Sequence, residues 1–424
     1  MAALAQGTAR DVKVIGVIGF AHLMSHFYFL VLPPILPLMK DDLGVSYAAL
    51  GLIMTGYGIS AGIAQTPVGF LIDRIGGRPA LVVGMAAQGA CIALMGFADA
   101  YWQLLVLYAL AGAANTVYHP ADYAILTAAI PKERIGRAYS IHLFSGNFGW
   151  AITPAVMVGL TALWGWHSAF VIVGLIGVLF SLFLWTQGRL LDDDIHMRER
   201  RIAAEKQKPA SEMRSGGDVS EGIRLLFTLP IMMCFWFFIF VSLGFTGLRG
   251  FFVAAMDLLY STPLAAANGA LSGFLLGSAL GILAGGMLAD RIGPRMSIAA
   301  VTLVSAGVLV VLIGVMPMPL AVLIGVMSAS GFLQGVLLPT RDLLVRSVTP
   351  DGSMGKVMGF LSSGTMLASG VVPVLFGWIL DAFDPNWVFW ISAVFISGAL
   401  FTFVTAQERA PGGTAQERTP GEGN

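Results

Sequence analysis

The chain has 424 residues, and its 24 basic and 24 acidic side chains give a formal net charge of zero at pH 7. Hydrophobic residues make up 57% of it, charged residues make up only 11%, and the mean hydropathy is +0.81. A soluble domain of this length could not bury so much apolar surface, and without excess positive charge there is no reason to expect a nucleic-acid partner. The composition therefore predicts an integral membrane protein surrounded by the lipid bilayer.

Apolar segments follow one another along almost the whole chain, each close to the 20 or so residues that a helix needs to cross a bilayer. In chain order we predict twelve such segments, at 14–36, 47–70, 79–98, 102–128, 136–162, 167–187, 229–255, 264–288, 296–316, 319–345, 355–380 and 387–406. Charged and polar residues after the sixth segment predict a cytoplasmic linker at 188–226. We therefore expect an all-α fold of twelve transmembrane helices in two pseudo-symmetric six-helix bundles, 1–187 and 227–406, followed by a disordered tail at 407–424.

Basic residues are distributed very unevenly between the two sides that these helices define. The loops on one side contain nearly all of them, whereas the opposite loops contain only Lys40. The positive-inside rule therefore predicts cytoplasmic termini in a multi-pass protein of the cell membrane, such as a bacterial inner membrane. The first segment is long and lacks a clear small-residue cleavage site, so we expect a permanent helix rather than a signal peptide. Cys91 and Cys234 lie within apolar segments and are expected to be buried thiols.

One charged loop occurs twice, after the second predicted helix of each half. The ten residues from Gly69 to Arg78 return as Gly286 to Arg295, about 217 residues later, with seven identical positions. A shift of 219 residues extends the match to the fourth and fifth helices, whose prolines recur in the tenth and eleventh. Such an internal repeat predicts a transporter built from two related halves.

Together, these features resemble the major facilitator superfamily, which has twelve helices, a long central cytoplasmic loop and a Gly-x-Leu-x-Asp-Arg-x-Gly-x-Arg loop. Four stretches resemble its fosmidomycin-resistance-type branch of drug exporters, namely His22–Tyr28, Leu32–Pro34, Tyr118–Pro120 and Gly146–Gly149. The resemblance implies a monomer that works by alternating access, with the first, fourth, seventh and tenth helices lining a central cavity. The branch commonly has an Asn-Asp pair where this chain has Ser25 and His26, so the first helix lacks an acid for a coupled proton.

The resemblance also implies that the duplicated loop is a conformational latch, which holds the outward-facing state. Its charged members are Asp73, Arg74, Arg78, Asp290, Arg291 and Arg295. A role in folding and topology alone is the alternative. Asp122 and Arg341 stand at equivalent positions of the two halves, and we predict either a salt bridge that closes the cytoplasmic side or separate pairs within each half. For Asp342 the simplest partner is Arg346, one helical turn away.

Ionisable side chains inside a membrane cost about 2.5–3.5 kcal/mol and therefore usually face a cavity or a partner. The candidates for the substrate or proton site are His22, His26, Asn115, His119, His142, Arg249 and Gln334. His22 and His26 share one face of the first helix, and histidine exchanges protons near neutral pH, so they are the first candidates. The alternatives are interhelical hydrogen bonds for the histidines, bending of the helix for His119, and snorkelling to the interface for Arg249.

The predicted activity is secondary active transport. We expect proton-coupled export of a small amphiphilic or anionic organic compound. Proton-symport uptake of a small organic anion, such as a monocarboxylate, is the second reading, and a non-transporting membrane sensor or scaffold is the third. The sequence contains no phosphate-binding loop, no recognisable metal cluster and no nucleophilic triad, so we predict no enzyme, no cofactor and no metal.

Overall fold

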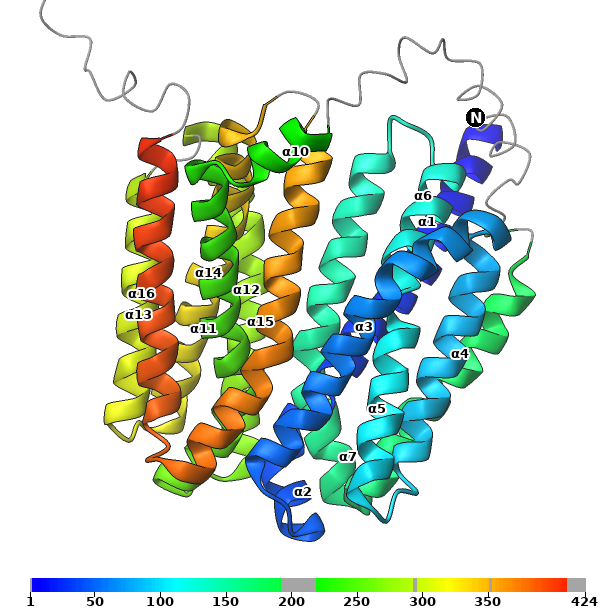
Figure 1. The fold of residues 1–424 in the computed structure, drawn as a ribbon. Coiled ribbons are helices and arrows are strands. Elements are labelled where there is room, and N and C mark those ends of the chain that lie inside the picture. The colour runs from blue at the N-terminus through cyan, green and yellow to red at the C-terminus, as the bar shows by residue number, and fades with distance from the viewer. Residues whose placement is uncertain (1, 189, 192–218, 293–295, 351–352, 410–424) are drawn as a thin grey trace, which may run out of the picture.

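The computed structural model describes residues 2–188, 190–191, 219–292, 296–350 and 353–409. Figure 1 shows two groups of long helices standing side by side, with the start of the first helix and the end of the last at the same end of the molecule. We call these groups the N-terminal and C-terminal halves.

The N-terminal half begins with a long helix and a short connection. Its elements are α1 (Ala2–Phe29), η1 (Pro33–Ile35), α2 (Leu36–Leu43), α3 (Tyr47–Ile75), α4 (Gly77–Met95), α5 (Tyr101–Asn115), α6 (Tyr118–Ala129) and α7 (Ile135–Thr186). The C-terminal half contains α10 (Val219–Leu226), α11 (Leu229–Tyr260), α12 (Leu264–Ile292), α13 (Met296–Val315), α14 (Leu320–Val348), α15 (Met354–Ala382) and α16 (Trp387–Glu408).

Ten helices of the described chain are long and apolar enough to cross a membrane, so the predicted count of twelve remains a prediction. Two local features account for the difference. α7 has 52 residues and would extend for about 78 Å at 1.5 Å per residue, but it is interrupted at Gly165, whose φ of 80° and ψ of 160° favour glycine. The fourth predicted segment is divided into α5 and α6, and each part is too short to cross alone.

Small residues allow the helices of the C-terminal half to pack with their backbones in contact. A Cβ atom added to Gly277 or Gly281 of α12 would lie 2.1 Å from a carbonyl oxygen of α14. One added to Gly331 of α14 would lie 1.9 Å from the carbonyl oxygen of Phe274. No larger residue fits there, and contacts between small residues are a common basis of helix association in membranes.

The two halves contact each other through two helix pairs, α3 with α15 and α7 with α12. α3 and α15 meet at the end of the molecule opposite the termini (Figure 1). Thr55 donates a hydrogen bond of 2.7 Å to the carbonyl of Gly370. The carboxylate of Asp381 accepts hydrogen bonds from the backbone N–H groups of Tyr47 and Ala48, at 2.9 and 2.7 Å. These N–H groups belong to the first turn of α3, which lacks intrahelical partners and carries the positive end of the helix dipole. An acid of one half therefore caps a helix of the other.

Toward the end that carries the termini, α3 and α15 diverge (Figure 1). A Cβ atom added to Gly51 would lie 2.1 Å from the carbonyl oxygen of Pro373, and one added to Gly62 would lie 3.7 Å from the sulfur of Met366. One added to Gly69 would meet nothing within 4 Å. The contact between α3 and α15 is therefore close at the end of α3 next to α2, and it is absent at the end of α3 near the termini.

Candidate functional site

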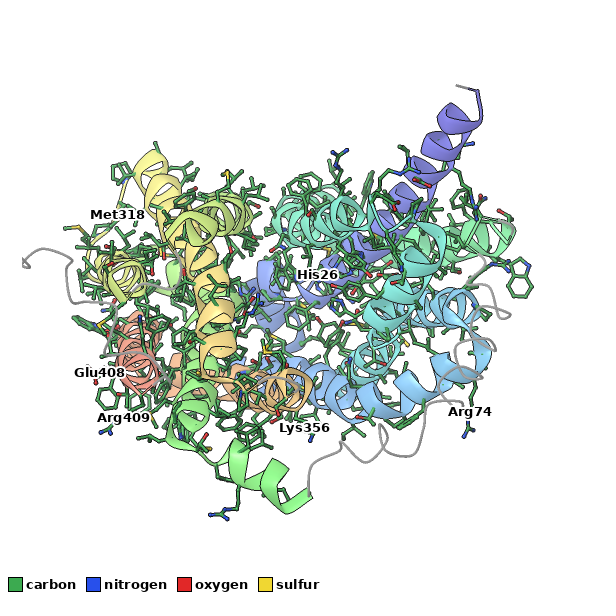
Figure 2. The ribbon with its side chains drawn as sticks, turned by 90° about the horizontal axis from the view of Figure 1, so that it is seen from above. His26, Arg74, Met318, Lys356, Glu408 and Arg409 are labelled. Atoms are coloured by element: carbon green, nitrogen blue, oxygen red, sulfur yellow. The ribbon has the colours of Figure 1, made fainter. Side chains whose placement is uncertain are left out.

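Four of the six histidines of the chain lie together inside the N-terminal half. α1 contributes His22 and His26, α6 contributes His119, and α7 contributes His142. Together with Asp122 of α6, we call them the histidine cluster. Figure 2, seen from above, places His26 near the middle of the molecule.

His22 is central to the cluster, because its ring contacts the other three. Its ring centroid lies 3.7 Å from that of His142, 4.5 Å from that of His26 and 4.9 Å from that of His119, and the His142 ring is stacked on it. His22 and His142 are buried, His26 is half-buried and His119 is exposed. The cluster therefore extends from the interior of the half to an accessible rim.

Asp122 supplies the carboxylate of the cluster. Its Oδ2 lies 3.5 Å from Nδ1 of His22 and 3.9 Å from Nδ1 of His142, and its side chain is fully buried. The first helix lacks an acid at position 26, and α6 contributes one beside His22, one helical turn away. Two imidazoles beside one carboxylate can exchange protons or ligate a cation.

The absence of a side chain at Gly146 leaves room for two imidazoles against α7. A Cβ atom at this position would lie 2.6 Å from Nε2 of His22 and 2.9 Å from Cε1 of His26. Gly149 brings α7 onto the backbone of α1, since its added Cβ would lie 2.3 Å from the carbonyl oxygen of Leu23. The Gly146–Gly149 stretch therefore sets the distance between α1 and α7 at the cluster.

One aromatic side chain connects the histidine cluster to the C-terminal half. The ring of Trp150 in α7 packs against His26 with centroids 4.3 Å apart. The guanidinium of Arg249 in α11 lies 5.0 Å from the Trp150 ring centroid, within cation–π range. Trp150 therefore lies between the cluster and the cation of the other half.

Arg249 also lines a small cavity of about 30 Å³ between the two halves, which is partly open to the outside. The lining residues are Phe29, Leu30, Pro33, Met54, Tyr57, Gly58, Tyr108, Thr246, Arg249, Gly250, Ser369 and Pro373. Arg249 is the one charged residue among these. No carboxylate of the described chain lies within ion-pair distance of it, and its hydrogen bond is to the hydroxyl of Thr246 at 3.3 Å. The cavity therefore presents a single cation in apolar and aromatic surroundings.

Comparison with known proteins places this architecture in a family. The family model of the Major Facilitator Superfamily matches residues 18–267 and 250–422, which together span most of the chain. The chain belongs to the major facilitator superfamily. It is accordingly a multi-pass membrane transporter of small molecules and not an enzyme.

Individual members of the superfamily are similar over most of their length. The chain is 23% identical over 379 residues to the fosmidomycin resistance protein of Escherichia coli (strain K12), covering 87% of this chain and 86% of that protein. It is 24% identical over 368 residues to a probable sulfoacetate transporter, SauU, of Cupriavidus necator, covering 81% of each. A bacterial homologue of the human lysosomal transporter Spinster, crystallised in an inward-facing and unoccupied conformation, has a TM-score of 0.74 at 15% identity and covers 94% of this chain and 95% of its own. The resemblance predicted from the sequence is confirmed.

Asn115 and Gln334, at equivalent positions of the superfamily repeat, have different surroundings. The side-chain oxygen of Asn115 accepts hydrogen bonds from Ser25 at 2.8 Å and from Gln88 at 3.2 Å, so it is engaged between helices of its own half. Gln334 is buried in α14, and among the described residues no hydrogen bond or ring contact joins it to the histidine cluster. A role in substrate or proton binding stays a prediction for both.

Asp122 and Arg341 belong to separate groups in this conformation. Arg341 donates from Nε and Nη2 to the carboxylate of Asp342, at 2.9 and 2.8 Å, and lies over the ring of Phe238 at 4.3 Å. Of the two predicted arrangements, the structure therefore has separate pairs within each half, because the buried histidines surround Asp122. The prediction that Asp342 pairs with Arg346 is wrong in this conformation, because the guanidinium of Arg341 binds the Asp342 carboxylate instead.

The charged residues of the duplicated loop are described only in part. Arg78 donates a hydrogen bond to the carbonyl of Trp185, which ties the loop to α7 of its own half, and Arg74 is exposed. Outside the described part of the chain lie Arg295 and the side chains of Asp73, Asp290 and Arg291. The latch function of this loop stays a prediction.

Gly146 and Trp150 have contacts with the histidines that the sequence analysis did not predict. Both lie on one face of α7 with His142, because the three residues are spaced by four along the helix. This four-residue spacing is the sequence pattern from which their position beside the histidines could have been predicted. It remains ambiguous in the sequence, since glycine and tryptophan are also frequent where membrane helices simply pack.

Proposed function

We propose that this superfamily member is a proton-coupled transporter of a small organic anion, which binds at Arg249 between the two halves. The position of Arg249 carries the proposal. A guanidinium inside the membrane-spanning part of a protein is costly without a counter-charge, and the described chain provides no carboxylate at ion-pair distance. The Trp150 ring compensates this charge only in part.

An anionic group of a substrate would complete the pairing. The planar guanidinium offers paired N–H donors that fit a carboxylate, sulfonate or phosphonate in a bidentate way. Of the two tyrosine hydroxyls of the cavity, that of Tyr108 donates to backbone carbonyls of α1, whereas that of Tyr57 accepts from Gln88 and keeps its O–H as a donor. A compact substrate with one anionic end and a largely apolar remainder therefore matches the chemistry of this lining best, and its binding requires the cavity to widen.

The histidine cluster supports proton coupling, because imidazoles exchange protons near neutral pH and Trp150 contacts both His26 and Arg249. A proton bound there adds positive charge near the anion. Proton and anion then strengthen each other's binding, and the coupling is reciprocal by linkage. This sign of coupling favours co-transport, in which an inward proton gradient drives uptake.

Export in exchange for protons is the second candidate. The similarity to the fosmidomycin resistance protein favours it, whereas the similarity to SauU, named for the organic anion sulfoacetate, favours anion transport in general. In an exchanger, proton and substrate must compete. The pH dependence of anion affinity therefore separates the two candidates, since affinity rises with acidity for co-transport and falls for exchange.

The side of the membrane follows from the charge distribution. Most basic residues lie in loops at the end that carries the termini, which supports a cytoplasmic location for that end. The contact formed by Thr55 and Asp381 then lies on the outer side. The conformation would be inward-open, and transport would require this contact to break while the diverging end closes.

The test is a ligand screen by thermal shift on the purified chain, with sulfoacetate and fosmidomycin among the anions, followed by flux into proteoliposomes under an imposed proton gradient. We expect an anion that binds more tightly at pH 6 than at pH 8. Arg249→Met should weaken its binding at least about 30-fold, since loss of one partner of a buried charge pair costs about 2–5 kcal/mol, and Arg249→Lys should retain part of it. Arg346→Gln, at an exposed arginine of α14, is the control. Unchanged anion binding in Arg249→Met would refute the assignment of the site.

A further inference from the structure

Three side chains from three different helices converge on one point inside the histidine cluster. His22 of α1, Asp122 of α6 and His142 of α7 have exposed fractions of 0%, 0% and 1%. Their ligand atoms all lie within 4.8 Å of one another. The Nδ1 atoms of both imidazoles lie within 4 Å of the same carboxylate oxygen, Oδ2 of Asp122.

The separations within this group do not match hydrogen bonds. The distances from Oδ2 of Asp122 to Nδ1 of His22 and of His142 are 3.5 and 3.9 Å, whereas an N–H···O bond spans about 2.7–3.2 Å. Zinc binds imidazole nitrogen and carboxylate oxygen at about 2.0–2.2 Å, so two ligand atoms on a tetrahedral ion lie about 3.3–3.5 Å apart. Of the two observed distances, the one to His22 matches this value and the one to His142 is about 0.4 Å longer. Because the two rings are stacked, binding of one ion by both Nδ1 atoms requires one imidazole to rotate.

The polar atoms of this group also lack other partners. In the described chain, both ring nitrogens of His22 and of His142 and both carboxylate oxygens of Asp122 are buried without a hydrogen bond. Six such atoms in one place are costly, because buried polar groups are normally paired. A cation held by Asp122 Oδ2 and the two Nδ1 atoms would satisfy three of them at once.

We propose that His22, Asp122 and His142 form a binding site for a divalent transition-metal ion of the zinc type. Imidazole nitrogen with one carboxylate is a donor set suited to Zn²⁺, Ni²⁺ or Co²⁺, whereas Mg²⁺ prefers oxygen ligands alone. Three protein ligands leave a coordination position open. His26 and His119 form a second group with His22, again within 4.8 Å.

The site was not foreseen from the sequence, because its ligands lie about 100 and 20 residues apart and match no metal-binding spacing. It goes beyond the proposed anion transport and does not depend on it. Ligating imidazoles must be unprotonated, so metal binding should weaken as the pH falls. A metal bound here would also place positive charge beside His26, on the side of Trp150 away from Arg249.

The experiment measures Zn²⁺ binding to the full chain in detergent, purified with a tag that contains no histidine. Competition with a chromophoric zinc chelator at pH 7.5 gives affinity and stoichiometry. We expect saturable binding of one ion per chain, with Mg²⁺ unable to compete. His22→Gln and His142→Gln should each weaken the affinity at least tenfold, and Asp122→Asn should do so as well.

The matched control removes the histidines outside the cluster, His167 and His196, of which His196 lies outside the described residues. The double variant His167→Ala/His196→Ala should bind Zn²⁺ as the unchanged chain does. Gly146→Ala is a second kind of variant, which keeps every ligand but displaces the His22 ring, and should also weaken binding. Size-exclusion chromatography establishes that each variant is folded.

Absence of saturable zinc binding in the unchanged chain would overturn the inference. So would binding that survives His22→Gln and His142→Gln but disappears in the control. Since the readout is metal affinity rather than flux, failure of the metal site leaves the anion proposal standing, and failure of anion binding leaves the metal site standing.

Discussion

α6 and α14 occupy equivalent places in the two halves, yet their charged side chains are in opposite situations. Asp122 of α6 is fully buried among histidines, whereas Arg341 of α14 is 22% exposed and pairs with Asp342, which is 51% exposed. The shift of 219 residues that superposes Pro120 on Pro339 also superposes these two positions. The two halves therefore share the prolines that bend the helices but differ in the charged side chains at equivalent positions.

The difference divides the functional chemistry between the halves. The N-terminal half holds the histidine cluster, to which we assign proton exchange and metal binding, and the C-terminal half supplies Arg249, the cation of the cavity. Trp150 provides the contact between these two regions. In alternating access the halves move relative to each other, so such an unlike pair of half-sites changes its mutual distance during the cycle.

The largest expected effect comes from neutralising the two equivalent positions in turn. Asp122→Asn leaves buried imidazoles without their carboxylate, and we expect acid-driven accumulation of the substrate to fall at least about 100-fold, since breaking a buried pair costs about 3–5 kcal/mol. Arg341→Gln removes a partly exposed pair worth about 0–1 kcal/mol, so accumulation should fall less than about fivefold. Flux into proteoliposomes measures both. Equal losses would mean that the two positions act alike, against the comparison.

The tight packing at the cluster is tested by two alanine substitutions in α7. Gly146→Ala forces a methyl group against His22 and should destabilise the chain by about 1–3 kcal/mol, as overpacking does. Gly159→Ala is the matched control, because nothing lies within 4 Å of its added Cβ. Thermal unfolding followed by tryptophan fluorescence should show a lower Tm for the first variant alone. An unchanged Tm for Gly146→Ala would contradict the close approach of α1 and α7.

The contact between the halves gives a smaller effect. Asp381→Asn removes the charge that caps α3, a change worth about 1 kcal/mol, so the equilibrium should shift about fivefold toward separation at this end. Spin labels at Lys40→Cys and Asp384→Cys, on a background without native cysteines, report the distance between the halves there. We expect a larger population of long distances. Asp99→Asn, at an exposed acid of the N-terminal half, should leave the distribution unchanged.

The smallest effect concerns a direct pairing of Asp122 with Arg341. In this structure each has its own neighbours, so exchanging the charges in the double variant Asp122→Arg/Arg341→Asp should not restore activity lost in the single variants. The coupling energy from a double-mutant cycle of transport rates should stay below about 0.5 kcal/mol. Recovery of activity by the double variant would show that the pair forms in another state of the transport cycle.

Part of the candidate site could be predicted because helical periodicity is a local property. His22 and His26 lie four residues apart, so they share a face of α1 whatever surrounds it. The convergence of Asp122, His142 and Trp150 on that face could not be predicted, because it depends on how α6 and α7 are rotated and how closely they approach. Gly146 decides that approach, and in the sequence it looks like many other glycines of the chain.

The sequence by itself determined the membrane location, the internal repeat and the family, because these depend on hydropathy, on self-similarity and on a charged loop motif, all of which are readable without coordinates. Tertiary structure alone decided which polar groups meet. A buried charge is stabilised by partners within a few ångströms, and in a helix bundle those partners belong to other helices. Asp122 therefore lies beside His22 and His142 rather than Arg341, and Arg249 lies over Trp150 and lines the cavity.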